Sequence, residues 1–218
     1  MNFGLITEGA SEHKIIKHLV SRYFKDEMLI INQIQPKIVN DRQETTGGWN
    51  EVLKYCEREE INGALIENDY IIIQIDTDQS GTKPFSVSHT DSKGKLKSPE
   101  QLLDEVLQKL ADLIMPEIRK KHEGKILFAV CIHTIECWLL PLFYDNKHKS
   151  DTSNCLSKLN AELIKKGIHG ITNANKNKPN GIRSYDAILR GFKKKTDIIT
   201  ASKHNAGFRR FVDALGTV

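Results

Sequence analysis

The segment Tyr70–Asp78, with the sequence YIIIQIDTD, constrains the fold more than any other part of the chain. Its isoleucine-rich first part indicates a strand buried on both faces, as in a parallel sheet covered by helices. Two carboxylates follow at once. Because residues i and i+2 of an extended segment point to the same side, Asp76 and Asp78 can direct both carboxylates at one point. Such a pair suits Mg²⁺, which prefers oxygen ligands and needs only one or two protein carboxylates.

The 218 residues, 39% hydrophobic and 28% charged, suffice for one globular domain with a real core, or for one domain with a small appendage. No segment approaches the length of a membrane span, and the N-terminal segment becomes charged too soon for a secretory signal. We therefore expect a cytoplasmic protein. The cysteine spacing indicates neither a zinc site nor a disulfide framework, so buried free thiols are expected. The four cysteines are Cys56, Cys131, Cys137 and Cys155.

Apolar, strand-like segments alternate with amphipathic, helical ones over the first 140 residues. The predicted strands cover residues 2–7, 29–39, 70–75 and 125–132. The predicted helices cover residues 11–23, where Ser11 is the expected N-cap, residues 49–59, and a segment that begins at Ser98 with a capping-box sequence. This alternation predicts an α/β domain with a mainly parallel sheet flanked by helices.

The last third of the chain has a different character. We expect residues 1–144 to form the α/β core, and residues 145–218 to form a polar insertion and a basic C-terminal helical region packed on that core. Within the latter, helices are predicted near residues 155–166 and 185–192, and a final helix is capped by His204 or Asn205. The polar segment 79–97 is predicted to be a mobile loop beside the paired aspartates.

Four acids fall at or just after the predicted strand ends. They are Glu8, Asp76, Asp78 and Glu136. Because ligands of open α/β sheets bind beyond the carboxyl ends of the strands, we expect these side chains to converge.

Each acid also has an ordinary structural interpretation. Glu8 can be a surface carboxylate stabilised at a helix N-terminus, and Asp76 with Asp78 can form an Asx turn that ends a strand. Glu136 stands in an apolar run, so it is either exposed or held by a partner.

Basic residues gather in the last quarter of the chain, although the net charge is only +4. A basic surface beside an acidic metal site is what a phosphodiester-binding enzyme needs. The alternative is a solvated, lysine-rich surface. The expected nucleic-acid-binding residues are Lys193, Lys194, Lys195, Arg209 and Arg210.

The order Leu-Ile-Thr-Glu8-Gly followed by Ile-Asp76-Thr-Asp78 resembles the Toprim domain of topoisomerases, primases and nucleases. The Ile-Glu136-Cys-Trp-Leu-Leu segment and the Ser-Lys203-His-Asn stretch resemble more narrowly the stand-alone Toprim-like proteins of phage-defence loci, including the overcoming-lysogenization-defect nucleases. The resemblance covers roughly residues 2–140 and the C-terminal helix.

This resemblance implies a Toprim-like, Rossmann-like fold and a metal-dependent endonuclease that hydrolyses phosphodiester bonds, with DNA as the expected substrate, in anti-phage defence. It implies that Mg²⁺ or Mn²⁺ is held by Glu8, Asp76, Asp78 and Glu136, and that Lys203 contacts the scissile phosphate. The segment after Asp78 is longer and more basic than a Toprim domain needs. No ATPase domain accompanies the chain, so a separate ATPase partner is expected.

Two other functions remain open at this point. The Asp76-Thr-Asp78 segment also resembles the nucleophile loop of haloacid dehalogenase-type phosphatases, although that loop normally follows the first strand. The chain can also be a non-catalytic subunit that keeps a Toprim shape and binds nucleic acid or a partner protein.

Overall fold

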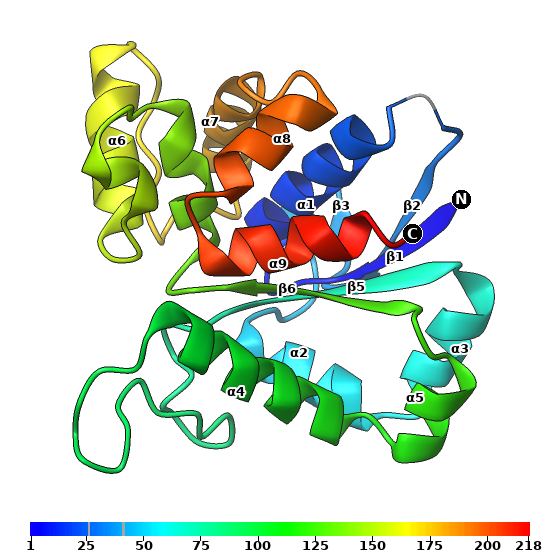
Figure 1. The fold of residues 1–218 in the computed structure, drawn as a ribbon. Helices are drawn as coiled ribbons and strands as arrows, with labels where there is room; N and C mark the ends of the chain where they lie inside the picture. The colour runs from blue at the N-terminus through cyan, green and yellow to red at the C-terminus, as the bar shows by residue number, and fades with distance from the viewer. Residues whose placement is uncertain (26, 41) are drawn as a thin grey trace.

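Four parallel strands form the central sheet, in the order β2-β1-β5-β6 (Figure 1). The strands are β1 (Asn2–Ile6), β2 (Ile30–Gln35), β5 (Tyr70–Asp76) and β6 (Ile126–Cys131), and β3 (Ile38–Val39) and β4 (Arg42–Gln43) form a separate antiparallel ribbon. The structure is a computed structural model that describes residues 1–25, 27–40 and 42–218. The predicted α/β class with a parallel sheet is confirmed.

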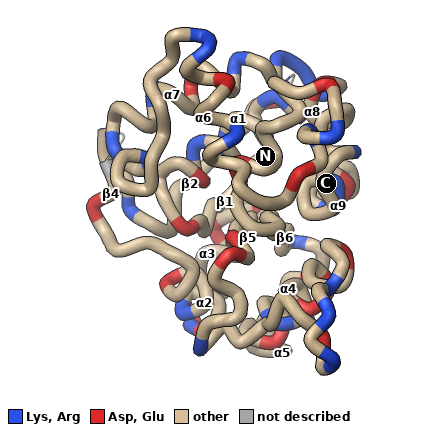
Figure 2. Tube along the Cα trace, turned by 90° about the vertical axis from the view of Figure 1, so that its left-hand side faces the viewer, with Lys and Arg blue, Asp and Glu red and all other residues tan. Residues whose placement is uncertain are grey.

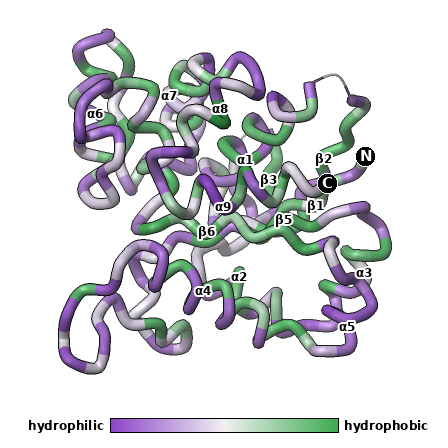
Figure 3. Tube along the Cα trace, viewed as in Figure 1, coloured by the Kyte–Doolittle hydropathy of each residue, from purple (hydrophilic) through white to green (hydrophobic). Residues whose placement is uncertain are grey.

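Helices cover both faces of this sheet, and the hydrophobic strands lie between the two layers (Figures 1 and 3). One layer contains α1 (Ala10–Tyr23), α6 (Cys155–Lys165), α7 (Pro179–Leu189), α8 (Lys195–Ser202) and α9 (Ala206–Leu215). The other contains α2 (Trp49–Glu57), α3 (Glu60–Glu67), α4 (Pro99–Leu113) and α5 (Pro116–Lys121). Two 3₁₀ helices, η1 (Ile135–Leu142) and η2 (Lys147–Ser150), follow β6.

Strand β5 is buried on both faces, as its isoleucines predict. Ile72 packs into the cluster beneath α1 and α9, whereas Ile71 and Ile73 pack into the cluster beneath α2 and α4. All three side chains are fully buried. The alternation of side chains along a strand therefore divides one apolar run between two cores.

The C-terminal region packs on the sheet and completes its upper layer. Helix α9 lies along β6, and the Trp138 ring of η1 stacks on Phe208 with the centroids 4.6 Å apart. A Cβ on Gly207 would lie only 2.1 Å from the carbonyl oxygen of Val130, so glycine permits this close approach. Residues after 145 are thus part of the same core as α1 and β1.

Several helix boundaries differ from the sequence-based expectations. Gly9, not Ser11, is the N-cap of α1, and Ser11 lies in the first turn. Helix α7 begins at Pro179, before the predicted residue 185, and helices α3 and α8 were not predicted. The Ser98 capping box and the Asn205 cap are confirmed by side-chain hydrogen bonds. The segment 79–97 has no helix, yet Phe85 within it is fully buried.

The expectation of four free thiols was wrong for two cysteines. Cys137 and Cys155 form a disulfide, with Cα atoms 5.0 Å apart, which joins η1 to the start of α6. Spacing could not reveal this pair, because the fold brings the two residues together. Cys56 and Cys131 are free and buried, as expected. Within the described part of the chain, no helix is long and apolar enough to cross a membrane.

Candidate functional site

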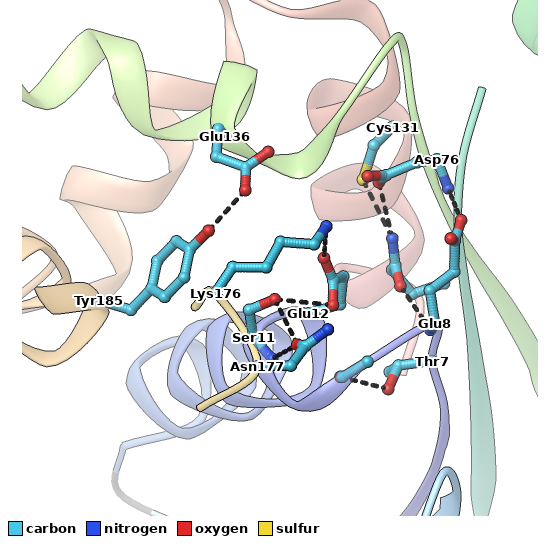
Figure 4. Close-up of polar contacts among 12 residues, drawn as sticks. Thr7, Glu8, Ser11, Glu12, Asp76, Cys131, Glu136, Lys176, Asn177 and Tyr185 are labelled. Atoms are coloured by element: carbon cyan, nitrogen blue, oxygen red, sulfur yellow. Dashed lines mark hydrogen bonds and ion pairs between the residues drawn. The ribbon is translucent and has the colours of Figure 1, made fainter. Parts of the chain in front are cut away.

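Glu8 and Asp76 meet at the carboxyl ends of two neighbouring strands. Because β1 and β5 are parallel partners, with Ile6 opposite Ile73, the residues that follow them emerge at the same edge of the sheet. The backbone N–H of Asp76 donates a hydrogen bond of 2.6 Å to Oε1 of Glu8 (Figure 4). The expected convergence of these two acids is therefore found.

Gln74 holds both acids in place from within β5. Its Oε1 accepts from the Glu8 N–H at 3.1 Å, and its Nε2 donates to Oδ1 of Asp76 at 2.9 Å. The Gln74 side chain is fully buried. The sequence analysis overlooked this residue, although a single polar side chain inside an apolar strand is a signal that it has a buried polar partner.

A third acid, which the sequence analysis did not identify, lies one helical turn further along the chain. Glu12 is 1% exposed, and its Oε1 lies 2.9 Å from Nζ of Lys176, on the segment before α7 (Figure 4). Ser11 Oγ donates to Oε2 of Glu12 at 2.8 Å. A Cβ on Gly9 would lie 2.6 Å from that same carboxylate, so a larger residue there would displace the Glu12 side chain.

Burial and mutual repulsion set the protonation of this cluster. Burial, followed by the charges of Glu8 and Glu12, raises the pKa of Asp76 well above its ordinary value. Burial likewise raises the pKa of Glu8 to about 8. Burial alone would also raise the pKa of Glu12, but the ion pair with Lys176 outweighs it and the net shift is downward.

Lys176 is the cation of the cluster. Its pKa is raised first by Glu12 and then, against the effect of burial, by Glu136 and Asp76. Figure 4 shows the lysine side chain between Glu136 on one side and Asp76 on the other. The sequence analysis counted Lys176 only among the basic residues of the last quarter.

Glu136 occupies η1, after the end of β6. It is 2% exposed, and Oε1 accepts a hydrogen bond of 2.5 Å from the hydroxyl group of Tyr185 in α7 (Figure 4). Of the two interpretations left open for this acid, the structure shows the one with a partner. Burial and the nearby Glu136 raise the pKa of Tyr185 well above its ordinary value, so this hydroxyl stays protonated and donates.

A pocket of about 330 Å³ connects these groups. Its lining includes Glu8, Asp76, Asp78, Glu136 and Lys176. Asp78 is exposed, unlike Asp76. The backbone carbonyl of His133, a residue with φ of 65°, accepts from the N–H groups of Thr77 and Asp78 and so fixes this turn.

The pocket is not a preformed metal cage. Among residues 1–25, 27–40 and 42–218, no group of three or more His, Cys, Asp or Glu side chains is close enough to hold a metal ion. The four acids expected to converge thus line one pocket, but they do not form a single ligand cluster.

The basic residues expected to bind phosphate lie elsewhere. Lys203 is exposed and lines another pocket with Tyr23 and Arg209. Arg209 and Arg210 lie 3.7 Å and 3.0 Å from the carboxylates of Glu100 and Asp104 on α4, respectively. Lys195 Nζ stands over the ring of Tyr23, and Lys193 and Lys194 begin α8 with backbone hydrogen bonds to Asp197. Both basic and acidic residues occur along the chain in α4, α8 and α9 (Figure 2).

Comparison with known proteins identified no relative of this chain. No protein-family model matches the chain, and no curated protein and no solved structure matches it.

Proposed function

We propose that the chain is a metal-dependent nuclease of the Toprim type that hydrolyses phosphodiester bonds of nucleic acid, with DNA as the expected substrate, in anti-phage defence. The observation that carries this proposal is the meeting of Glu8 and Asp76 at the ends of β1 and β5, in a pocket that also exposes Asp78. The family resemblance of the sequence adds the reaction class. A separate ATPase chain is part of the same proposal.

The acids present fit a small Mg²⁺ or Mn²⁺ site. Such an ion needs one or two protein carboxylates, because water and substrate phosphate complete its shell. The hydrogen bonds at Glu8 and Asp76 use one oxygen of each carboxylate. Burial chiefly raises the pKa values of Glu8 and Asp76, and repulsion from neighbouring acids adds to it, so a nearby cation would favour both carboxylates. Glu8 and Asp76 would hold the ion, with Asp78 at the open side, and Glu136 lies across Lys176 from them.

When bound, the ion supplies an activated water and offsets charge on the phosphate. The other tasks belong to side chains of this protein. Gln74 orients Asp76 and Glu8, and Tyr185 orients Glu136. Lys176, rather than Lys203, is the lysine in the pocket, so we assign it the contact with a phosphate oxygen of the substrate.

A cleavage assay tests the proposal. Supercoiled plasmid DNA is incubated with the protein and Mn²⁺ or Mg²⁺, and nicked and linear products are measured on a gel. Cleavage is expected to stop in EDTA and to fall at least about 100-fold in Asp76→Asn, because an amide is a weaker ligand than a carboxylate. Glu57→Gln, an exposed change on α2, is the matched control and should cleave normally. Activity that survives in Asp76→Ala combined with Asp78→Ala would refute the assignment.

One observation favours a second function, namely binding of nucleic acid or a partner without turnover. Lys176 forms an ion pair with Glu12 and lowers the pKa values of Glu8 and Asp76, so a cation of the protein itself already offsets part of the charge in the cluster. Nucleic-acid binding that is unchanged by EDTA, with no product from either DNA or RNA, would support this second function.

A further inference from the structure

A second pocket, of about 650 Å³, is about twice as large as the pocket of about 330 Å³ at the carboxylates. Its floor is the outer face of α1, and its walls come from β2, β3 and α7. None of the residues that line it also lines the carboxylate pocket. It is therefore a separate feature, and the proposed nuclease reaction does not use it.

Basic side chains line this second pocket. Lys14, Lys17 and Arg22 line it from successive turns of α1, and Asp186 is the acid among the lining residues. The Asp186 carboxylate lies 2.9 Å from Nζ of Lys14 and is half exposed. Lys17 and Arg22 add two positive charges beside this ion pair, which favours an anionic ligand.

The two histidines of the pocket do not add to this positive charge. Burial and then the charge of Lys17 lower the pKa of His13 to about 4. Burial also lowers the pKa of His18, and Arg22 adds to this effect. Both rings are therefore disfavoured as cations, chiefly by burial, so the lysines and the arginine carry the charge.

The remaining walls suit an organic group more than a bare ion. Ile38 offers partly exposed apolar surface from β3, and Gln33 and Asn40 offer amides beside it. Pockets that enclose small molecules typically measure about 300–1,000 Å³. The size and the mixture of apolar, amide and cationic groups match a base and sugar that carry several phosphates.

We infer that this pocket, formed by α1, α7 and the β2–β3 region, binds a nucleoside polyphosphate. Lys17 and Arg22 contact the phosphates, and the wall of Gln33, Ile38 and Asn40 contacts the base or sugar. The inference goes beyond the proposed nuclease activity, because it assigns a ligand to a pocket that shares no lining residue with the carboxylates.

Isothermal titration of the full chain with ATP, in EDTA to keep metal ions from the carboxylates, tests the inference. Lys17→Gln combined with Arg22→Gln should weaken binding about tenfold or more, because charge-assisted hydrogen bonds to phosphate are lost. Asp186→Asn should tighten binding severalfold, since it removes the carboxylate from the pocket. Lys93→Gln combined with Lys95→Gln removes the same charge from an exposed loop and is the matched control.

Parallel titrations distinguish the sources of phosphate. Tripolyphosphate and adenosine should each bind more weakly than ATP, and a short single-stranded DNA should not compete with ATP. The inference is overturned if the wild-type chain does not bind ATP or if the Lys17 and Arg22 variant binds it normally. Tripolyphosphate that binds as tightly as ATP, or competition by the DNA, overturns it as well. Asp186→Asn should tighten binding, whereas Lys17→Gln combined with Arg22→Gln should weaken it. A loss of folded protein could not produce tighter binding, so the pair of results does not depend on it.

Discussion

Lys176 Nζ lies 2.9 Å from Oε1 of Glu12, and this ion pair joins the loop before α7 to the first turn of α1 across 164 positions of the sequence. Glu136 and Asp76 also contribute to the raised pKa of the lysine. One ammonium group therefore lies among acids that come from the ends of β1, β5 and β6 and from the first turn of α1, and it offsets part of their charge. The predictions below begin from this pair.

Lys176→Met should lower the free energy of unfolding by about 3 kcal/mol, because it leaves the buried carboxylate of Glu12 without its counter-charge. Urea unfolding at pH 7 measures the change. Glu12→Gln added to Lys176→Met should restore much of the loss, since the unpaired charge is then removed. Lys178→Met, at an exposed position two residues away, is the control. Equal effects of the two lysine changes would contradict the ion pair.

Tyr185→Phe should destabilise the protein by about 2 kcal/mol, because a buried carboxylate loses its donor. The change removes one oxygen and leaves the ring packed, so the loss reports the contact with Glu136. Thermal and urea unfolding measure it. Glu136→Gln in the Tyr185→Phe background should cost little more, and additive losses would show that the two side chains act separately.

His13 makes stability depend on pH. Its pKa is lowered from 6.5 to about 4, chiefly by burial, so the unfolded chain binds a proton at pH values where the folded chain does not. The contribution of His13 to stability is therefore full above pH 6.5 and is lost as the pH drops to about 4, by up to about 3 kcal/mol.

The prediction for His13 is tested by comparing how steeply the free energy of unfolding changes with pH in the wild type and in a variant. The free energy of unfolding of the wild type and of His13→Gln is measured by urea at intervals between pH 7 and pH 4. The variant should lose less stability over this range than the wild type. His169→Gln, at an exposed position, should keep the slope of the wild type.

Removal of the disulfide should also cost stability. Cys137 and Cys155 close a loop with a sequence separation of 18, for which the chain-entropy estimate is about 3 kcal/mol. Cys137→Ala combined with Cys155→Ala should show this loss in urea unfolding, and reduction of the wild type with dithiothreitol should reproduce most of it. A wild type insensitive to reductant would contradict the assignment of the bond.

The sheet could be predicted from the sequence because its signals are local. The isoleucines of β5 and the Ser98 capping box each specify a strand or a helix within a few residues. The boundaries of α1 and α7 were harder to predict. Ser11 has the right chemistry for an N-cap, but its hydroxyl group is used by Glu12 and Asn177, contacts that depend on the tertiary fold.

The residues of the candidate site also fall into a group that local sequence predicts and a group that depends on the tertiary fold. Glu8 and Asp76 could be predicted as neighbours, because both end parallel strands. Glu12, Lys176 and Tyr185 could not, since a helix turn and a distant segment contribute them and no local pattern joins these positions. The Cys137–Cys155 bond was missed for the same reason.

Glu12 and Lys176 are far apart in the sequence, so the ribosome makes the acid well before the lysine that pairs with it. Chains emerge from the ribosome with the N-terminus first, so Glu8, Glu12 and Asp76 are all synthesised well before Lys176 and Tyr185. A nascent chain that stops before residue 176 carries the acids without the ammonium group that pairs with Glu12 in the finished protein. The charged edge of the sheet is thus completed only when residue 176 has been made, after the strands β1, β2, β5 and β6.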